Sequence, residues 1–161
     1  MKTINLNHGK VALIDDCDLE LISSFNWYAS FMNGSWYAIN GKAEKMHRLI
    51  MGVTDPQVRV GHKDLDGLNN QRSNLRIVTR SQINMNRRKQ PDTSSTFKGV
   101  CFDRSRQKWQ ANIMAPKTED HRSRRGRYVY LGRYDSELEA ATAYDAASMN
   151  LFGEYGRVNF E

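Results

Sequence analysis

The segment from Arg87 to Thr96 is the feature that most restricts how this chain can fold. Its sequence, RRKQPDTSST, passes from basic residues into a cluster of proline, aspartate, serine and threonine, which is typical of an exposed connection. The 161 residues suffice for one ordinary domain or two small ones, and not for a large doubly wound or barrel enzyme. We therefore expect two small parts joined by a linker at residues 91–96.

The charge is distributed unevenly along the chain. Lys and Arg total 24 against 18 Asp and Glu, which gives a net charge of +6 and a pI near 9.4. Residues 98–133 hold ten basic and three acidic residues, whereas residues 134–161 hold one and six, and residues 59–89 form a second basic block with eight against two. A polarised basic protein of this kind favours an anionic partner such as nucleic acid.

Several classes of protein are disfavoured by what the sequence lacks. No run approaches the roughly eighteen apolar residues of a membrane span, and the start MKTINLNHGK has no apolar secretory stretch, so we expect a cytoplasmic protein without a membrane partner. Cys17 and Cys101 lie far apart and form no CxxC, which argues against a disulfide framework or a four-cysteine zinc site. We expect both to be buried thiols.

The C-terminal part shows the periodicity of strands followed by a helix. Residues 108–115 and 127–134 alternate between apolar and polar positions, which predicts strands with one buried side. Residues 136–153 carry a helical stripe of mostly small side chains, opened by Ser136 and ended by Gly153. The stripe comprises Ala140, Ala141, Tyr144, Ala147 and Leu151. We expect a three-stranded antiparallel sheet packed on one helix.

The other face of that sheet is predicted to carry amides, cations and tyrosine rings. Such groups suit the edges of base pairs, which present paired donors and acceptors, although a merely solvated face also carries Lys, Gln and Asn. The predicted DNA-binding residues of this part are Lys98, Arg104, Arg106, Lys108, Gln110, Asn112, Tyr128, Tyr130 and Arg133.

The motifs FKGV, KWQANI, YLGRY, LEAATAYDAAS and VNF follow one another over residues 97–161. They resemble the signature of the APETALA-type (ethylene-response-factor) DNA-binding domain, and the resemblance implies a sheet that lies in the major groove of double-stranded DNA. Cys101 and Asp103 stand where those domains usually have base-reading arginines, and Lys98 and Tyr130 stand where Arg and Trp are typical. The plant recognition sequence is therefore not implied.

The N-terminal part reads as a β-rich segment over residues 1–57, followed by a ββα unit over residues 58–90. Short apolar strands and an Asn33-Gly34 turn between aromatic runs predict hairpins. We expect the aromatic residues beside this turn to pack in the sheet or core; they are Trp27, Tyr28, Trp36 and Tyr37. The overall prediction is an α+β chain.

The string VRVGHKDLDGLNNQRSNLRIVTRSQINMN resembles HNH homing endonucleases of phages and introns, and the lead-ins GKVALIDDCD and MHRLIMG extend the resemblance over residues 1–90. The resemblance assigns His62 as general base and Asn70 and Asn74 as loop-bracing residues. It also assigns DNA contacts to the basic residues of the second strand, the helix and its end, which are Arg76, Arg80, Arg87, Arg88 and Lys89.

The metal-ligand positions of that family do not carry over. Gly61 and Ile83 occupy them, and neither has an oxygen or nitrogen in its side chain to coordinate Mg²⁺. Asp64 and Asp66 are the candidates that could replace them, although metal ligands require accurate placement. We expect no cofactor, and we expect His47 to be a structural hydrogen-bonding residue.

These observations predict a sequence-specific double-stranded DNA-binding protein, derived from an HNH endonuclease and acting by occupancy as a regulator or repressor. Two alternatives remain. One is an active nicking endonuclease that uses His62 with Mg²⁺ or Mn²⁺. The other is a protein-binding module that uses the aromatic N-terminal sheet.

Overall fold

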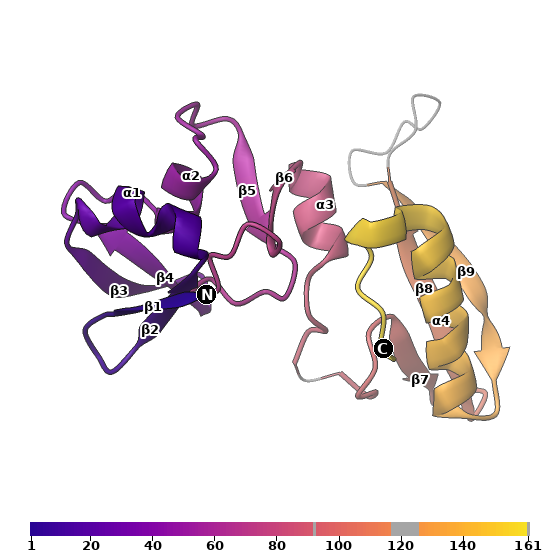
Figure 1. Cartoon of the computed structure of the whole chain (residues 1–161). Helices are drawn as coiled ribbons and strands as arrows, with labels where there is room; N and C mark the ends of the chain where they lie inside the picture. Colours follow the sequence, from indigo (N-terminus) through magenta and orange to yellow (C-terminus); the bar gives the residue numbers. More distant parts are fainter. Residues whose placement is uncertain (92, 117–125, 161) are drawn as a thin grey trace. The chain divides into compact units, whose positions relative to one another are not determined.

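The computed structural model describes residues 1–91, 93–116 and 126–160. The chain divides into two compact units, Met1–Arg80 and Ser81–Glu161 (Figure 1). Both units are mixtures of antiparallel sheet and short helices, with a single longer helix in the second. Among the residues described, no helix combines the length and apolarity needed to cross a membrane.

The first unit is built from three antiparallel hairpins, each forming its own two-stranded sheet. Its helices are short and connect these hairpins (Figure 1). The strands are β1 (Lys2–Asn5), β2 (Val11–Ile14), β3 (Trp27–Met32), β4 (Ser35–Asn40), β5 (Arg59–His62) and β6 (Leu75–Val78), and the helices are η1 (Asp16–Asp18), α1 (Leu19–Ser23) and α2 (Met46–Ile50).

The core of the first unit collects one apolar residue or two from nearly every element. Ile14, Ile22 and Met46 are completely buried, and Trp27 is anchored by a 2.9 Å hydrogen bond from its indole nitrogen to the carbonyl oxygen of Ile22. The prediction that four aromatic residues pack in the sheet or core is correct for Trp27, which is buried, and for Trp36, which packs against the core cluster. Tyr28 is exposed, while Trp36 and Tyr37 are half-buried, because a two-stranded hairpin covers only part of each face.

The second unit contains the predicted three-stranded sheet in the order β7-β8-β9, with helix α4 on one face. Its elements are α3 (Arg80–Met85), of which all but the first residue belong to this unit, β7 (Val100–Asp103), β8 (Lys108–Ala115), β9 (Arg127–Tyr134), α4 (Glu137–Phe152) and η2 (Gly153–Tyr155). Val100, Ala111 and Ile113 are buried on the helix-facing side of the sheet.

The inward stripe of α4 differs from the predicted one at its end. Ala140, Ala141 and Tyr144 are buried as expected, and Ser136 caps the helix by accepting a hydrogen bond from the Leu138 amide. Leu151 is exposed, and Phe152 takes the buried position instead. Each step of four residues advances about 40° beyond a full turn, so the row of buried residues Tyr144, Ser148 and Phe152 drifts round the helix towards Phe152 and away from Leu151.

The division between the units lies before the segment that the sequence suggested as a linker. The side chain of Met85 packs against the cluster of Ile113, Tyr144 and Phe152, so α3 belongs to the second unit. Part of the expected linker is also fixed there, because Ser95 is buried and donates a 2.7 Å hydrogen bond to Glu137 at the start of α4. A polar composition does not make a segment free when its hydroxyls and amides find partners.

Candidate functional site

The face of the second unit's sheet that α4 leaves uncovered is the first candidate site. The strand register places nine residues on this surface, which we call the open sheet face. They are Cys101, Asp103, Lys108, Gln110, Asn112, Met114, Tyr128, Tyr130 and Arg133. Eight of them are residues that the sequence placed there or at its edges, or noted as departures from the resembled family.

A carboxylate lies among the cations of the open sheet face. Asp103 Oδ2 accepts hydrogen bonds from Arg133 Nε at 3.2 Å and from Arg106 Nη1 at 3.3 Å. Hydrogen bonds from Ser105, and then from Arg106, lower the pKa of Asp103 to about 2. Lys108 is also paired, with Asp135. Part of the positive charge expected on this face is therefore balanced within the unit.

The middle of the open sheet face is a row of polar groups beside tyrosine rings. Gln110 donates a 2.9 Å hydrogen bond to the side-chain oxygen of Asn112, whose amide nitrogen lies 3.9 Å from the sulfur of Cys101. Burial, with a further contribution from Cys101, raises the pKa of Tyr128 above its usual value. Tyr128 and Tyr130 are both exposed. The row offers donors, acceptors and flat rings to a ligand with polar edges.

Cys101 is exposed, as is Cys17, so the expectation of buried thiols is wrong for both.

Lys98 does not lie on the open sheet face, and this corrects the prediction. It shares the alternation of Val100, which points to the helix side, and its ammonium donates a 2.5 Å hydrogen bond to the carbonyl oxygen of Met85. Burial, followed by repulsion from Arg157, lowers the pKa of Lys98 to about 8.

Among the other predicted cations, Arg104 lies in the exposed turn between β7 and β8. Basic residues of the same block that lie outside the described part of the chain are Lys117, Arg122, Arg124 and Arg125.

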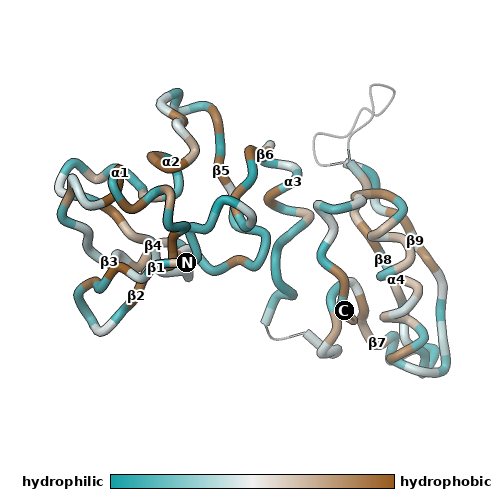
Figure 2. Tube along the Cα trace, viewed as in Figure 1, coloured by the Kyte–Doolittle hydropathy of each residue, from teal (hydrophilic) through white to brown (hydrophobic). Residues whose placement is uncertain are grey.

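The predicted cations around α3 are distributed over both units. Arg76 is half-buried on β6, opposite Gly61, whereas Arg80 is exposed at the start of α3. Arg87 and Arg88 are exposed in the hydrophilic stretch that follows α3, and Lys89 is half-buried there (Figure 2).

The second candidate site surrounds His62 at the end of β5. His62 is buried, and its Nε2 lies 3.4 Å from the side-chain oxygen of Asn70. Burial lowers the pKa of His62, against the opposing effects of the Asn70 hydrogen bond and of Asp64 and Asp66. Asn74 ties the loop together by donating to Asp64 Oδ1 at 2.9 Å and to the carbonyl oxygen of Asn69 at 2.8 Å. The sequence predicted this bracing role for Asn70 and Asn74.

A partner of His62 was missed by the sequence analysis. His47, in α2, makes an edge-to-face contact with His62 at a centroid distance of 4.8 Å, and Tyr37 lies within 6.0 Å of both rings. His47 is buried, and among the described residues its Nδ1 has no hydrogen-bond partner. Burial, followed by repulsion from His62, lowers the pKa of His47 to about 3. No spacing rule relates residues 47 and 62, because the contact depends on how α2 packs beside β5.

The residues around His62 do not fit a divalent cation. Gly61 has no side chain, and a Cβ built there would lie 3.1 Å from Cγ2 of Val78. Asp64 uses both carboxylate oxygens within the loop, accepting from Asp66 N at 2.8 Å and from Asn69 Nδ2 at 2.8 Å. Burial would raise the pKa of Asp64, but these donors outweigh it and lower the pKa. Asp66 caps the amide of Leu68. Within the described residues, no three His, Cys, Asp or Glu side chains are grouped to hold a metal ion.

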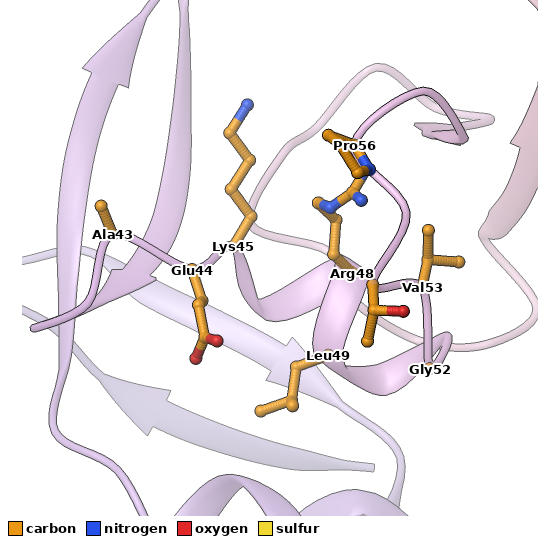
Figure 3. Close-up of a pocket in the computed structure, with 9 residues that line it drawn as sticks. Ala43, Glu44, Lys45, Arg48, Leu49, Gly52, Val53 and Pro56 are labelled. Atoms are coloured by element: carbon orange, nitrogen blue, oxygen red, sulfur yellow. The ribbon is translucent and has the colours of Figure 1, made fainter.

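A pocket of about 520 Å³ lies beside α2 in the first unit (Figure 3). Glu44, Lys45 and Arg48 contribute its charged groups, and Leu49 and Val53 contribute apolar walls. The guanidinium of Arg48 is already bound to the carbonyl oxygens of Val58 and Asp55, at 2.6 and 2.7 Å. The pocket therefore contains a structural arginine and neither of the two histidines described above.

Comparison with known proteins bears on the second unit. Residues 95–154 match the family model described as the AP2 domain, which confirms the resemblance predicted for residues 97–161. The match covers less than half of the chain. The similarity of residues 1–90 to HNH endonucleases stays a prediction, as does the ββα unit, whose helix belongs to the second unit.

The similar curated proteins are plant transcription factors. "AP2-like ethylene-responsive transcription factor ANT" of Arabidopsis thaliana is 38% identical over 90 residues, which are 52% of this chain and 16% of that protein. "Ethylene-responsive transcription factor ERF015" of the same plant is 40% identical over 83 residues, which are 45% of this chain and 41% of that protein. The chain thus spans less than half the length of these relatives. No solved structure matches the chain significantly.

Proposed function

We propose that this protein binds double-stranded DNA sequence-specifically through the open sheet face and acts by occupying its site, as a regulator or repressor. The observation that carries the proposal is that one face of the sheet forms the core with α4, whereas the other face is polar and takes no part in the core. α4 supplies the core on one face through residues such as Ala141 and Tyr144. The other face, which the core does not need, carries two amides, two tyrosines and the guanidinium group of Arg133.

The shape and chemistry of this face favour the major groove. That groove admits a β-ribbon and presents a distinct pattern of donors and acceptors for each base pair. Asn112 is buried, so Gln110 is the amide that can donate to and accept from a base edge, and the rings of Tyr128 and Tyr130 can pack on sugars or thymine methyl groups. The similar plant proteins are named transcription factors, and their names are consistent with this proposal.

We further propose that residues 1–90 descend from an HNH endonuclease and that the protein no longer cleaves DNA. Support comes from Gly61 and Ile83, which cannot coordinate a metal, and from Asp64, whose oxygens are used within its loop. In this proposal the protein needs neither Mg²⁺ nor Mn²⁺. Basic residues of β6, of α3 and of the stretch after α3 contact phosphates, and the protein resides with DNA in the cytoplasm of a bacterial or phage-infected cell. The candidate phosphate contacts are Arg76, Arg80, Arg87, Arg88 and Lys89.

The test is binding of the full chain to a duplex selected from a random library, followed by fluorescence anisotropy at several salt concentrations. Contacts to about six phosphates predict a log–log slope near −5. Tyr130→Ala on the open sheet face should weaken binding about tenfold, because apolar contact of the ring with sugars or thymine methyl groups is worth on the order of 1–2 kcal/mol. Asn150→Ala, on the exposed side of α4, is the matched control and should leave affinity unchanged. No duplex selected, a flat salt response, or equal effects of the two variants would overturn the proposal.

A further inference from the structure

A β-bulge decides which side chain of β9 reaches the open sheet face near Asp103. Asn112 pairs with Tyr130, but Ala111 pairs with Gly132, so Leu131 is an extra residue in β9. After the bulge the alternation is shifted by one, and Arg133 lies opposite Gln110. Without the bulge, Arg133 would share the helix-facing side with Val129 and Leu131. The fold thus brings an arginine to the exposed surface at a position where alternation alone would bury it.

The guanidinium of Arg133 is held from two directions. Its Nε donates to Asp103 Oδ2 at 3.2 Å, and its central carbon lies 5.4 Å from the centroid of the Tyr130 ring. Among the described residues, Asp103 is its only hydrogen-bonding or ion-pair partner. The side chain is 37% exposed. The Nε edge is therefore occupied, and the pair of terminal nitrogens is the part of the fork left for a ligand.

Asp103 is itself immobilised by the turn that follows β7. Its Oδ1 accepts from the amide of Ser105 at 3.1 Å and from the Ser105 hydroxyl at 2.6 Å. Its Oδ2 is shared between Arg133 and Arg106. The hydrogen bonds from Ser105 hold the Asp103 carboxylate in one orientation. Because Arg133 donates to this carboxylate, the rotamers open to the Arg133 side chain are restricted as well.

The carboxylate also determines which part of DNA this arginine can approach. A negative group beside Arg133 repels backbone phosphates, whereas it has no such conflict with the neutral edges of bases. Two parallel N–H donors require two adjacent acceptors, and in the major groove guanine alone presents O6 and N7 together. Lysine cannot reproduce this planar fork.

We infer that Arg133 is a specificity-determining residue that reads guanine through O6 and N7, with Asp103 and Tyr130 as its positioning residues. The inference rests on the proposed function, since it concerns the same sheet face. It assigns base recognition to a side chain in β9, two residues beyond the bulge, in a chain that has Cys101 and Asp103 where the resembled domains usually carry base-reading arginines.

The first experiment compares Arg133→Lys with Arg104→Lys, both in the full chain and on the duplex selected by the wild type. Both substitutions keep the charge and remove an arginine fork, but Arg104 lies in the exposed turn, and among the described residues the arginines paired with Asp103 are Arg106 and Arg133. For each guanine of the motif, the affinity ratio against adenine is measured. Arg133→Lys should reduce that ratio about 5- to 150-fold at one guanine, the worth of a bidentate contact. Arg104→Lys should change it at none.

The second experiment replaces guanines one at a time by 7-deazaguanine, which lacks N7, or by inosine, which keeps both O6 and N7. At one position, 7-deazaguanine should weaken wild-type binding at least about fivefold and inosine should not, while Arg133→Lys should be insensitive to both. Asp103→Asn should bind random DNA more tightly, since a repulsive charge is lost, yet discriminate less at that guanine. If the ion pair were merely structural, Asp103→Asn would not raise the affinity for random DNA while lowering the discrimination at that guanine.

The outcomes separate the two levels of the proposal. A chain that selects no motif overturns the proposed function together with this inference. A chain that selects a motif, but whose guanine preference and 7-deazaguanine sensitivity survive Arg133→Lys, overturns the inference alone. A selected motif in which no guanine contributes to the binding affinity also overturns the inference alone.

Discussion

The ammonium of Lys98 donates a 2.5 Å hydrogen bond to the carbonyl oxygen of Met85, the last residue of α3. The Arg157 amide donates to the same oxygen at 3.4 Å. Helix ends leave their last carbonyls without intrahelical partners, so these donors satisfy one of them. Together with the packing of the Met85 side chain, they fix the end of α3 within the second unit.

Lys98→Met should reveal the cost of burying this ammonium. The pKa of Lys98 is lowered from 10.5 to about 8, so between these values the unfolded chain binds more protons than the folded one. The unfolding free energy of the wild type, relative to Lys98→Met, should therefore rise as pH increases from 8 to 10.5. Chemical denaturation at a series of pH values measures it, with Lys108→Met as the control. A difference that stays flat or falls over this range would contradict the assignment.

Gly99 and Gly153 form a matched pair for testing close packing. Both have positive φ, at 77° and 53°, but a Cβ at Gly99 would overlap the Tyr144 ring and lie 2.8 Å from the Asn112 carbonyl oxygen. A Cβ at Gly153 meets nothing within 4 Å. Gly153→Ala should cost about 1–3 kcal/mol of unfolding free energy for the backbone alone, because φ 53° with ψ −132° is a conformation that L side chains rarely adopt. Gly99→Ala should cost about 1–3 kcal/mol more than its backbone strain, because its Cβ would displace the Tyr144 ring. Equal losses in thermal or chemical unfolding would mean that the Tyr144 contact is not tight.

His47 should make the first unit sensitive to acid. Burial lowers its pKa from 6.5 to about 3, so the unfolded chain binds the additional proton between these values and stability is lost as pH falls. The loss should be on the order of a few kcal/mol over this window. His47→Phe keeps a ring of similar size and removes the titration, so its unfolding free energy should fall less from pH 6.5 to 4. His8→Phe, at an exposed histidine, should behave as the wild type; a wild-type pH dependence in His47→Phe would refute the prediction.

The proposed loss of cleavage can be tested by restoring ligands. The wild type should leave supercoiled plasmid intact in Mg²⁺ or Mn²⁺, whereas Gly61→Asp combined with Ile83→Asn should nick it, because the two substitutions return oxygen ligands. Val78 lies close to the new side chain and must shift by a few tenths of an ångström. His62→Ala in the double variant should abolish nicking. Wild-type nicking that His62→Ala removes would show that other groups hold the metal, and no gain in the double variant would count against the predicted alignment.

The open sheet face could be anticipated in outline because strand alternation is a local property. The sequence predicted β8 and β9 over their observed ranges, and it placed Gln110, Asn112, Tyr128 and Tyr130 on one side. It also predicted that Asn70 and Asn74 brace the loop near His62, since the resembled motif keeps them at short spacing. Neither result required knowledge of distant contacts.

The sequence by itself determined the periodic elements, the separation of charge and the composition of the exposed face, because neighbouring residues decide these through backbone geometry and solvation. The tertiary structure alone decided the bulge that exposes Arg133, the burial of Lys98 against Met85, the attachment of Ser95 to Glu137 and the contact between His47 and His62. Each of these depends on groups that are far apart along the chain. Their meeting is set by how sheets and helices pack, and local patterning carries no information about it.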